Sequence, residues 1–196
     1  LVISTTLNNG NPDSAYPGST PAGLIWLHSG DFQRSVMTSS FSFGSSAGVC
    51  ATTPENSIKV SSANVFPGSP VFGSYGWQNS GTASNIDTCS GNAYADLFLR
   101  SSANISGAGK WTFVYQVPNG VYDVTILYNT VGSGTAGPTV ITLNGRTVVN
   151  GVSDASGNLE TFDGRVNVGG NQLLVGISSP SGTAALNGVI LTPVAK

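Results

Sequence analysis

The sequence predicts an all-β protein, an antiparallel β-sandwich of the jelly-roll kind. Its 196 residues are enough for one domain with a sizeable core. Apolar and polar residues alternate in short runs, which is the pattern of strands that are buried on one face. These runs recur about every ten residues and are separated by Gly, Asn and Pro turns, as in sandwiches and jelly rolls. No stretch has the length and the periodicity of a three-turn helix.

The first 40 residues are predicted to be an extension of the sandwich. Residues 1–7 alternate in the manner of a strand, and residues 8–22, rich in Gly, Pro, Ser and Asn, predict a linker or a long surface loop. The apolar run at residues 23–28 predicts a short buried strand. We therefore expect an N-terminal strand and Gly/Pro-rich extension over residues 1–40, and a β-sandwich domain over residues 41–196.

The sandwich is predicted to open with a strand at residues 40–44, which is followed by an irregular region from Cys50 to Asn92. Glycine and proline interrupt that region too often for long strands. Its aromatic residues are therefore expected in loops or in short edge pieces. Residues 94–99 fit a strand or a helical turn.

Residues 111–128 give the clearest strand pattern and are predicted to form the central hairpin. Aromatic and β-branched residues share one face of each run, at 111–117 in the first and at 122–128 in the second. The turn Pro118-Asn119-Gly120 joins them, because proline presets φ for a turn and glycine permits a positive φ. The rest of the chain is expected to pack around this hairpin.

The remaining strands are predicted from alternating runs that short turn signals separate. Residues 138–149 predict a hairpin around Asn144-Gly145, the strongest short turn signal that a sequence can carry. Residues 161–177 predict another hairpin around the turn 169–171. Residues 186–191 are expected to form the last strand.

The low charge of the chain excludes several classes of partner. Charged residues make up 8% of the sequence, against about 25% in ordinary soluble domains, and the net charge is −2. Such a surface has no positive field for phosphates, so nucleic acid is not an expected partner. No apolar run approaches the roughly 18 residues of a membrane span. The chain begins at Leu1 without Met, as after removal of a signal peptide, although an excised fragment would look the same.

The two cysteines, Cys50 and Cys89, are expected to form a disulfide. Two thiols and the single His28 do not complete a structural zinc site, which takes four ligands. A polar, charge-poor chain fits an oxidising compartment, where disulfides form. The alternative is a pair of separate buried thiols. Together these features predict a secreted or surface-exposed domain.

No catalytic constellation emerges, and the protein is predicted not to be an enzyme. Residues 44–48 fit the G-x-S-x-G pattern of serine hydrolases. That pattern needs a strand-to-helix turn and a downstream histidine, whereas the only histidine, His28, lies upstream and no helix follows. A glycosidase needs two carboxylates that face one bond, and the spacing of the 9 Asp and Glu residues nominates no pair.

No cofactor is predicted, although a structural Ca²⁺ is conceivable in one region. Asp87 and Asp96, with Asn85 and Asn92 nearby, could supply oxygen ligands to such an ion. The spacing of a calcium-binding loop is absent from the sequence. This absence favours the alternative, a loop held by its own hydrogen bonds.

The most informative cluster for function is Phe72, Tyr75, Trp77 and Tyr94, which lies among glycines and asparagines. Exposed aromatic rings stack on the C–H face of a pyranose, and Asn or Asp side chains bind its hydroxyl groups. The alternative is that Trp77 closes the mouth of the sandwich and the tyrosines cover the core. The predicted ligand-binding residues are Tyr75, Trp77, Asn79, Tyr94 and Asp96.

From about residue 41 to residue 192 the sequence resembles the malectin-like, galactose-binding-type jelly rolls that are often attached to secreted carbohydrate-active enzymes. In such domains, aromatic residues in loops and an acid near the last strands contact sugar, and Tyr75 and Trp77 fall on the aromatic motif. Here the loop 178–183 has no carboxylate, and Gln78-Asn79-Ser80 replaces the charged pair that often follows Gly-Trp. The resemblance rests on four motifs in the same order and rough spacing: Phe41-Ser-Phe-Gly44, Ser74-Tyr-Gly-Trp77, Val117-Pro-Asn-Gly-Val-Tyr-Asp-Val-Thr-Ile126 and Leu186-Asn-Gly-Val-Ile-Leu191.

Three functions are therefore expected as alternatives. The first is a secreted, non-catalytic module that binds a poly- or oligosaccharide through loop aromatics. The second is a structural subunit of an extracellular filament or surface layer, in which residues 1–7 of one copy add a strand to the sheet edge of another copy. The low charge would favour that self-association, because it removes repulsion between copies. The third is an accessory domain of a carbohydrate-active enzyme.

Overall fold

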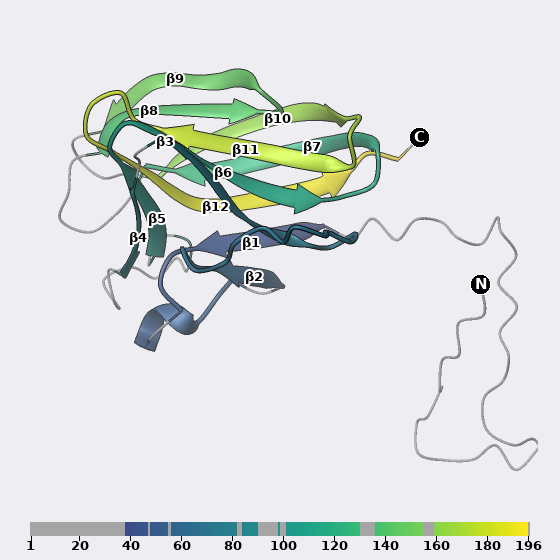
Figure 1. The fold of residues 1–196 in the computed structure, drawn as a ribbon, viewed down its shortest axis with the longest axis horizontal. Coiled ribbons are helices and arrows are strands. Elements are labelled where there is room, and N and C mark those ends of the chain that lie inside the picture. Colours follow the sequence, from purple (N-terminus) through teal and green to yellow (C-terminus); the bar gives the residue numbers. More distant parts are fainter. Residues whose placement is uncertain are drawn as a thin grey trace, which may run out of the picture. The chain divides into compact units, whose positions relative to one another are not determined.

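A computed structural model gives the fold of this protein (Figure 1). It describes residues 38–46, 48–54, 56–81, 84–89, 98, 101–129, 136–154 and 159–195. The chain divides into two units, and every described residue belongs to the second, Val36–Lys196. The strands predicted at residues 1–7 and 23–28 lie outside the described residues, as do Tyr94 and Asp96.

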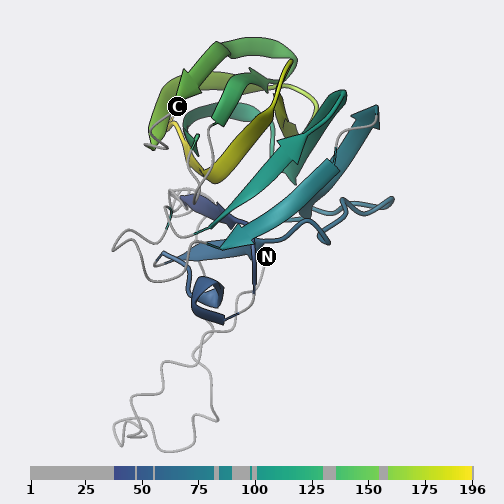
Figure 2. The same cartoon turned by 90° about the vertical axis from the view of Figure 1, so that its left-hand side faces the viewer.

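Two β-sheets form a sandwich, which confirms the predicted all-β class (Figures 1 and 2). Every pairing between the named strands is antiparallel except that of β1 with β2. The first sheet has the order β10 (Glu160–Val168), β7 (Gly120–Tyr128), β12 (Thr183–Pro193), β1 (Ser39–Phe43) and β2 (Ser57–Val60), with β5 (Ser101–Ser106) paired to β12 and β4 (Ser84–Cys89) paired to β5. The second sheet has the order β3 (Tyr75–Gly81), β6 (Gly109–Gln116), β11 (Gln172–Ser178), β8 (Ala136–Leu143) and β9 (Arg146–Asp154).

The core lies between the inner faces of the two sheets and is rich in aromatic rings. Phe41 and Phe43 of β1 are fully buried, which confirms the strand that was predicted at residues 40–44. Their rings lie 4.9 and 5.0 Å from the ring of Phe113 on β6, in edge-to-face geometry. Ring pairs of this kind add to the free energy of burying apolar area. Strand β1 therefore ties its own sheet to the facing one.

Residues 111–128 do not form a hairpin, so that prediction is wrong. Strand β6 pairs with β3 and β11 in the second sheet, whereas β7 pairs with β10 and β12 in the first. The alternation of apolar residues reports which face of a strand is buried, but it does not report which sheet the strand joins. Here both runs bury one face in the same core, and residues 117–119 carry the chain across from one sheet to the other.

The predicted hairpin at residues 161–177 is wrong for the same reason. Strand β10 lies in the first sheet and β11 in the second, so the turn 169–171 is a second crossing. The two crossings are bonded to each other. The Asn171 backbone N–H donates to Asn119 Oδ1 at 2.7 Å, and the Val117 N–H donates to the Asn171 carbonyl at 2.9 Å. Both crossings therefore lie side by side at one end of the sandwich.

The β8–β9 hairpin is confirmed and so is the last strand. Asn144 and Gly145 adopt positive φ values of 46° and 83°, which a tight two-residue hairpin turn requires. Strand β12 is longer than predicted and lies at the centre of its sheet, with a bulge between Leu186 and Gly188. The buried amide of Asn187 in this bulge donates to the carbonyls of Phe98 and Ser101, at 3.1 and 3.3 Å.

The expectation that residues 50–92 hold only short pieces is wrong for β3, which is seven residues long. Its outer edge is covered by residues 64–66. The Trp77 N–H donates to the Asn64 carbonyl at 2.7 Å, and the Phe66 N–H donates to the Trp77 carbonyl at 3.1 Å. Gly76 permits this approach, because a Cβ at that position would lie 2.4 Å from the Phe66 nitrogen. The glycine that suggested a break is what lets the strand form there.

The predicted disulfide is present between Cys50 and Cys89, with the Cα atoms 5.9 Å apart. It joins a short 3₁₀ turn (η1, Gly48–Ala51) to the end of β4. Among the residues that the structure describes, no helix is long and apolar enough to cross a membrane.

Candidate functional site

Three of the five predicted ligand-binding residues lie on β3, and the structure gives each a different environment. Trp77 is 1% exposed and packs against Phe43 and Phe113, with ring centroids 5.2 and 5.9 Å apart. Its Nε1–H donates to the Ser61 carbonyl at 3.1 Å. An indole that is enclosed in this way has no face to offer a sugar, so the structure removes Trp77 from the candidate contacts. It takes the alternative role, as part of the core.

Tyr75 is half-buried and covers one end of the same core. Its ring lies 5.4 Å from that of Phe41, which also contacts Tyr115 at 4.8 Å. The Tyr115 hydroxyl is hydrogen-bonded to Ser39 Oγ at 2.9 Å. Both tyrosines are therefore anchored on the core side, and only part of each ring faces outward. Tyr75 remains a candidate contact at the rim of this end.

Asn79 is exposed but lies at the opposite end of β3 from Tyr75, four residues along the strand. At about 3.3 Å per residue, the two Cα atoms are roughly 13 Å apart. Because of that separation, the structure does not bring Asn79 together with Tyr75 in one compact site. Tyr94 and Asp96 fall outside the described residues, so their part in a site remains a prediction.

The most exposed aromatic ring on the described surface is Phe72, whose side chain is 63% exposed. Four hydrogen bonds fix the backbone around it. Ser74 N–H donates to the Val71 carbonyl at 2.9 Å, and Val71 N–H donates to Ser74 Oγ at 3.0 Å. The Gly73 N–H donates to the Gln116 carbonyl, and the Gln116 N–H donates to the Ser74 carbonyl, at 2.9 and 2.8 Å. Phe72 is thus an exposed ring on a firmly bonded loop.

The loop is bonded to the backbone of Gln116 at the end of β6, and the Gln116 side chain is bonded to an amide on the next strand. Gln116 follows Tyr115 on β6 and faces Gln172 on β11, and the Gln172 Nε2 donates to Gln116 Oε1 at 3.1 Å. The turn 169–171 leads directly into Gln172 and is bonded to the crossing at residues 117–119. We call Phe72, Gln116, Gln172 and the turn 169–171 the Phe72 surface. On a surface that combines an exposed ring with amide side chains, the ring can stack on a sugar and the amides can bind its hydroxyl groups.

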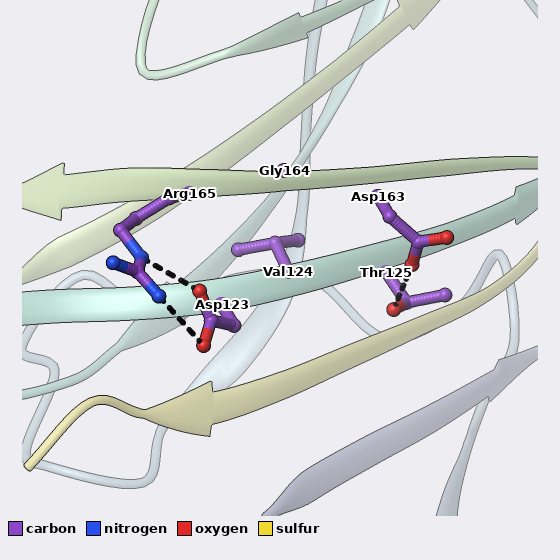
Figure 3. Close-up of a pocket in the computed structure, with 6 residues that line it drawn as sticks. All are labelled: Asp123, Val124, Thr125, Asp163, Gly164 and Arg165. Atoms are coloured by element: carbon purple, nitrogen blue, oxygen red, sulfur yellow. Dashed lines mark hydrogen bonds and ion pairs between the residues drawn. The ribbon is translucent and has the colours of Figure 1, made fainter.

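A second feature lies on the outer face of the first sheet, where β7 and β10 flank a shallow depression of about 440 Å³ (Figure 3). The Arg165 guanidinium binds both Asp123 carboxylate oxygens, at 2.8 and 3.3 Å. On the other side of Gly164, Thr125 Oγ1 donates to Asp163 Oδ1 at 2.5 Å. The hydrogen bond from Arg165 lowers the pKa of Asp123 below its usual value. A carboxyl held ionised in this way is unsuited to act as a general acid.

The structure also gives Lys59 an environment that sequence patterns do not signal. Its half-buried ammonium donates to Ser101 Oγ, to the Phe43 carbonyl at 3.3 Å and to Ser42 Oγ at 3.5 Å. Burial lowers the pKa of Lys59 from 10.5 to about 8, with the Asp87 charge opposing the shift. A serine beside such a lysine would suggest a nucleophile. Ser101 is 1% exposed, however, so a substrate does not reach its hydroxyl in this conformation.

The calcium interpretation gains no support from Asp87. Its carboxylate accepts hydrogen bonds from Ser62 N–H, at 2.8 and 3.1 Å, and from Ser62 Oγ at 2.9 Å. This is the hydrogen-bonded loop that the sequence offered as the alternative. Within the described residues, no group of three or more His, Cys, Asp or Glu side chains could hold a metal ion.

Comparison with known proteins shows likeness at the level of the fold. The sequence matches no protein-family model and no curated protein. Protein YXIM of Bacillus subtilis superimposes with a TM-score of 0.56 and 22% identity, over 81% of this chain and 40% of that one. Bacteroides uniformis β-glucuronidase 2 gives 0.56 and 18%, over 86% and 19%. The plant receptor-like kinase FER gives 0.54 and 12%, over 82% and 43%.

This chain spans less than half the length of each of these three chains. At such identities the likeness establishes a shared β-sandwich fold and carries no function across. It is consistent with the malectin-like, galactose-binding type of sandwich that the sequence motifs indicated.

Proposed function

We propose that this protein is a non-catalytic carbohydrate-binding module whose ligand contacts the Phe72 surface. The observation that supports this most directly is the exposure of Phe72, 63% on a loop that four backbone and side-chain hydrogen bonds hold in place. A large apolar side chain exposed to water forgoes about 1.5–3 kcal/mol that burial would contribute. A ligand that covers the ring recovers that free energy.

A sugar fits the surroundings of the ring. The C–H face of a pyranose can pack on the phenyl ring, while the Gln116 and Gln172 amides offer donors and acceptors to its hydroxyl groups. The backbone hydrogen bonds of the loop keep Phe72 in place before the ligand arrives, so little conformational entropy is lost on binding. Tyr75 lies at the rim and would contact a ligand longer than one ring.

The proteins that share this fold, and the disulfide of this chain, support the same proposal. The similar structures include a β-glucuronidase and a plant receptor-like kinase, proteins in which a related sandwich is one part of a longer chain. The Cys50–Cys89 disulfide fits an extracellular location, because disulfides persist in oxidising compartments. An accessory domain of a carbohydrate-active enzyme would perform the same binding within a larger protein.

The test is retention on immobilised polysaccharides and binding to a glycan array. The Phe72→Ala variant should lose about tenfold or more in affinity, which corresponds to the free energy of covering one ring. The control is Val121→Ala, which trims another exposed apolar side chain, on the outer face of β7. Equal binding by both variants would refute the assignment of the site. Failure of the unmodified protein to bind any glycan would refute the function.

A second candidate is the self-assembling subunit, and β9 is the feature that favours it. Strands β2, β4 and β10 are edges of the first sheet and β3 and β9 those of the second, and residues 64–66 cover the edge of β3. Charged residues lie on β2, β4 and β10, but from Thr147 to Ser153 the β9 edge has none. An uncharged edge can accept a strand from another chain. Deleting residues 1–10 should abolish assembly by that route, and a truncated protein that still assembles would exclude it.

A further inference from the structure

The turn 169–171 contains two glycines that the fold does not explain. Neither Gly169 nor Gly170 adopts a positive φ, and a Cβ built at either position meets no atom within 4 Å. Most glycines that the structure describes have a positive φ, as Gly145 does, or lie where a Cβ would clash with another atom, as at Gly76. Glycine in place of alanine enlarges the conformational freedom of the unfolded chain and so lowers stability. A role in binding a ligand, rather than in folding, would account for both glycines.

These glycines belong to the Phe72 surface. The Asn171 backbone accepts from Val117 N–H at 2.9 Å, and the next residue back, Gln116, accepts from Gly73 N–H at 2.9 Å. This chain of bonds runs from the exposed ring to the glycine turn. A turn without side chains lets a ligand approach the backbone closely, where N–H and C=O groups can bond it.

The same end of the sandwich carries almost no charge. Residues 61–81, 111–120 and 166–178 contain no Asp, Glu, Lys or Arg. Arg146 begins β9 opposite Leu143, which faces Val175 on β11, so its backbone lies two strand spacings, about 10 Å, from Val175 and farther from Gln172. That distance exceeds the screening length of about 8 Å at physiological salt. The carboxylate of an anionic sugar on this surface would lose its hydrating water without gaining an ion pair with a cationic side chain.

We infer that the Phe72 surface takes an uncharged polysaccharide chain, laid across Phe72 and the Gly169–Gly170 turn, and rejects uronate-containing chains. The inference rests on the proposed function and specifies its ligand. A ring that stands out of the surface at 63% exposure does not enclose the end of a chain, so internal sugar units bind as well as terminal ones. Affinity should therefore rise with chain length beyond the monosaccharide.

The experiment compares each acidic polymer with its own neutral form. Polygalacturonate, alginate and carboxymethyl-cellulose are run in affinity gels beside the same polymers with their carboxyl groups reduced to alcohols, and neutral glucans, galactans, xylans and mannans complete the set. We expect retention by at least one neutral polymer, and binding to its acidic form at least about tenfold weaker, because an unpaired carboxylate is desolvated.

Two variants test the turn. The double variant Gly169→Ala with Gly170→Ala should keep or raise the melting temperature, since the added methyl groups meet nothing, and should lose about tenfold in affinity for the retained polymer. Ser153→Thr adds a methyl group to an exposed position on β9 and serves as the control. Unchanged affinity in the double variant would remove the turn from the site.

The outcomes separate the inference from the function on which it rests. Binding to an acidic polymer as strong as to its reduced form, or stronger, overturns the inference but leaves the carbohydrate-binding function standing. If that binding is lost in Arg146→Gln, the cation on β9 defines the specificity instead. Binding to no polymer of either kind overturns the function and the inference together.

Discussion

Replacing Trp77 by phenylalanine separates its role in the core from the role in sugar binding that its motif suggested. The change removes the hydrogen bond from Nε1 to the Ser61 carbonyl, which contributes about 1 kcal/mol. It also leaves a void in a position that is 1% exposed, and partial cavities of this kind cost about 1–2 kcal/mol. The total predicted loss of stability is therefore about 2–3 kcal/mol.

Urea unfolding followed by tryptophan fluorescence and circular dichroism measures that loss, and thermal scans should show a melting temperature lower by roughly 5–10 °C. Binding to a retained polysaccharide should be unchanged at a temperature where the variant is folded, because Trp77 has no exposed face. A Trp77→Phe protein of unaltered stability that no longer binds would refute our placement of this residue in the core.

Two further perturbations follow from the same contacts. Replacing Cys50 and Cys89 by serine should lower the unfolding free energy by about 4 kcal/mol in the chain-entropy model, measured by urea unfolding, and an unchanged midpoint would contradict a formed disulfide. Lys59 has a lower pKa folded, about 8, than its ordinary value of 10.5, so the unfolded chain binds more protons between these values and stability should rise with pH across that window. In Lys59→Met this rise should vanish, with the variant more stable than the parent below pH 8; parallel pH profiles of the two proteins would contradict the burial of that ammonium.

Local alternation in the sequence was sufficient to place most strands. Phe41 and Phe43, the Asn144-Gly145 turn and the run at 186–191 all behave as their patterns predict, because each pattern reports a property of the strand itself. The disulfide was accessible for a similar reason, since only one pair of cysteines exists.

Local alternation could not predict which of the two sheets each strand joins. The segments 111–128 and 161–177 read as hairpins because a short Gly-containing turn joins two alternating runs. Whether such a turn returns within one sheet or crosses to the facing sheet depends on partners that are distant in the sequence. Here the bond from Asn171 to Asn119 Oδ1 joins the two crossings, across 52 positions.

The residues of the candidate site could not be grouped from the sequence either, because distant parts of the chain bring them together. Tyr75 and Trp77 share one motif, yet the facing sheet encloses Trp77 and leaves Tyr75 at the rim. The ring that is exposed, Phe72, was part of the aromatic cluster, but the other members of its surface, Gln116 and Gln172, come from strands far along the chain. No spacing rule joins them. Exposed glycines without a positive φ, such as Gly169, are equally invisible before the backbone is known.

Nuclear magnetic resonance of the labelled protein, titrated with a neutral oligosaccharide from a retained polymer, tests the central claim most directly. Backbone amide shifts should change at Phe72, Gln116 and Gly169–Gly170, with little change on the outer face of β7 and β10. Shifts that instead gather around Asp123, Asp163 and Arg165, the residues that line the depression in Figure 3, would contradict the account.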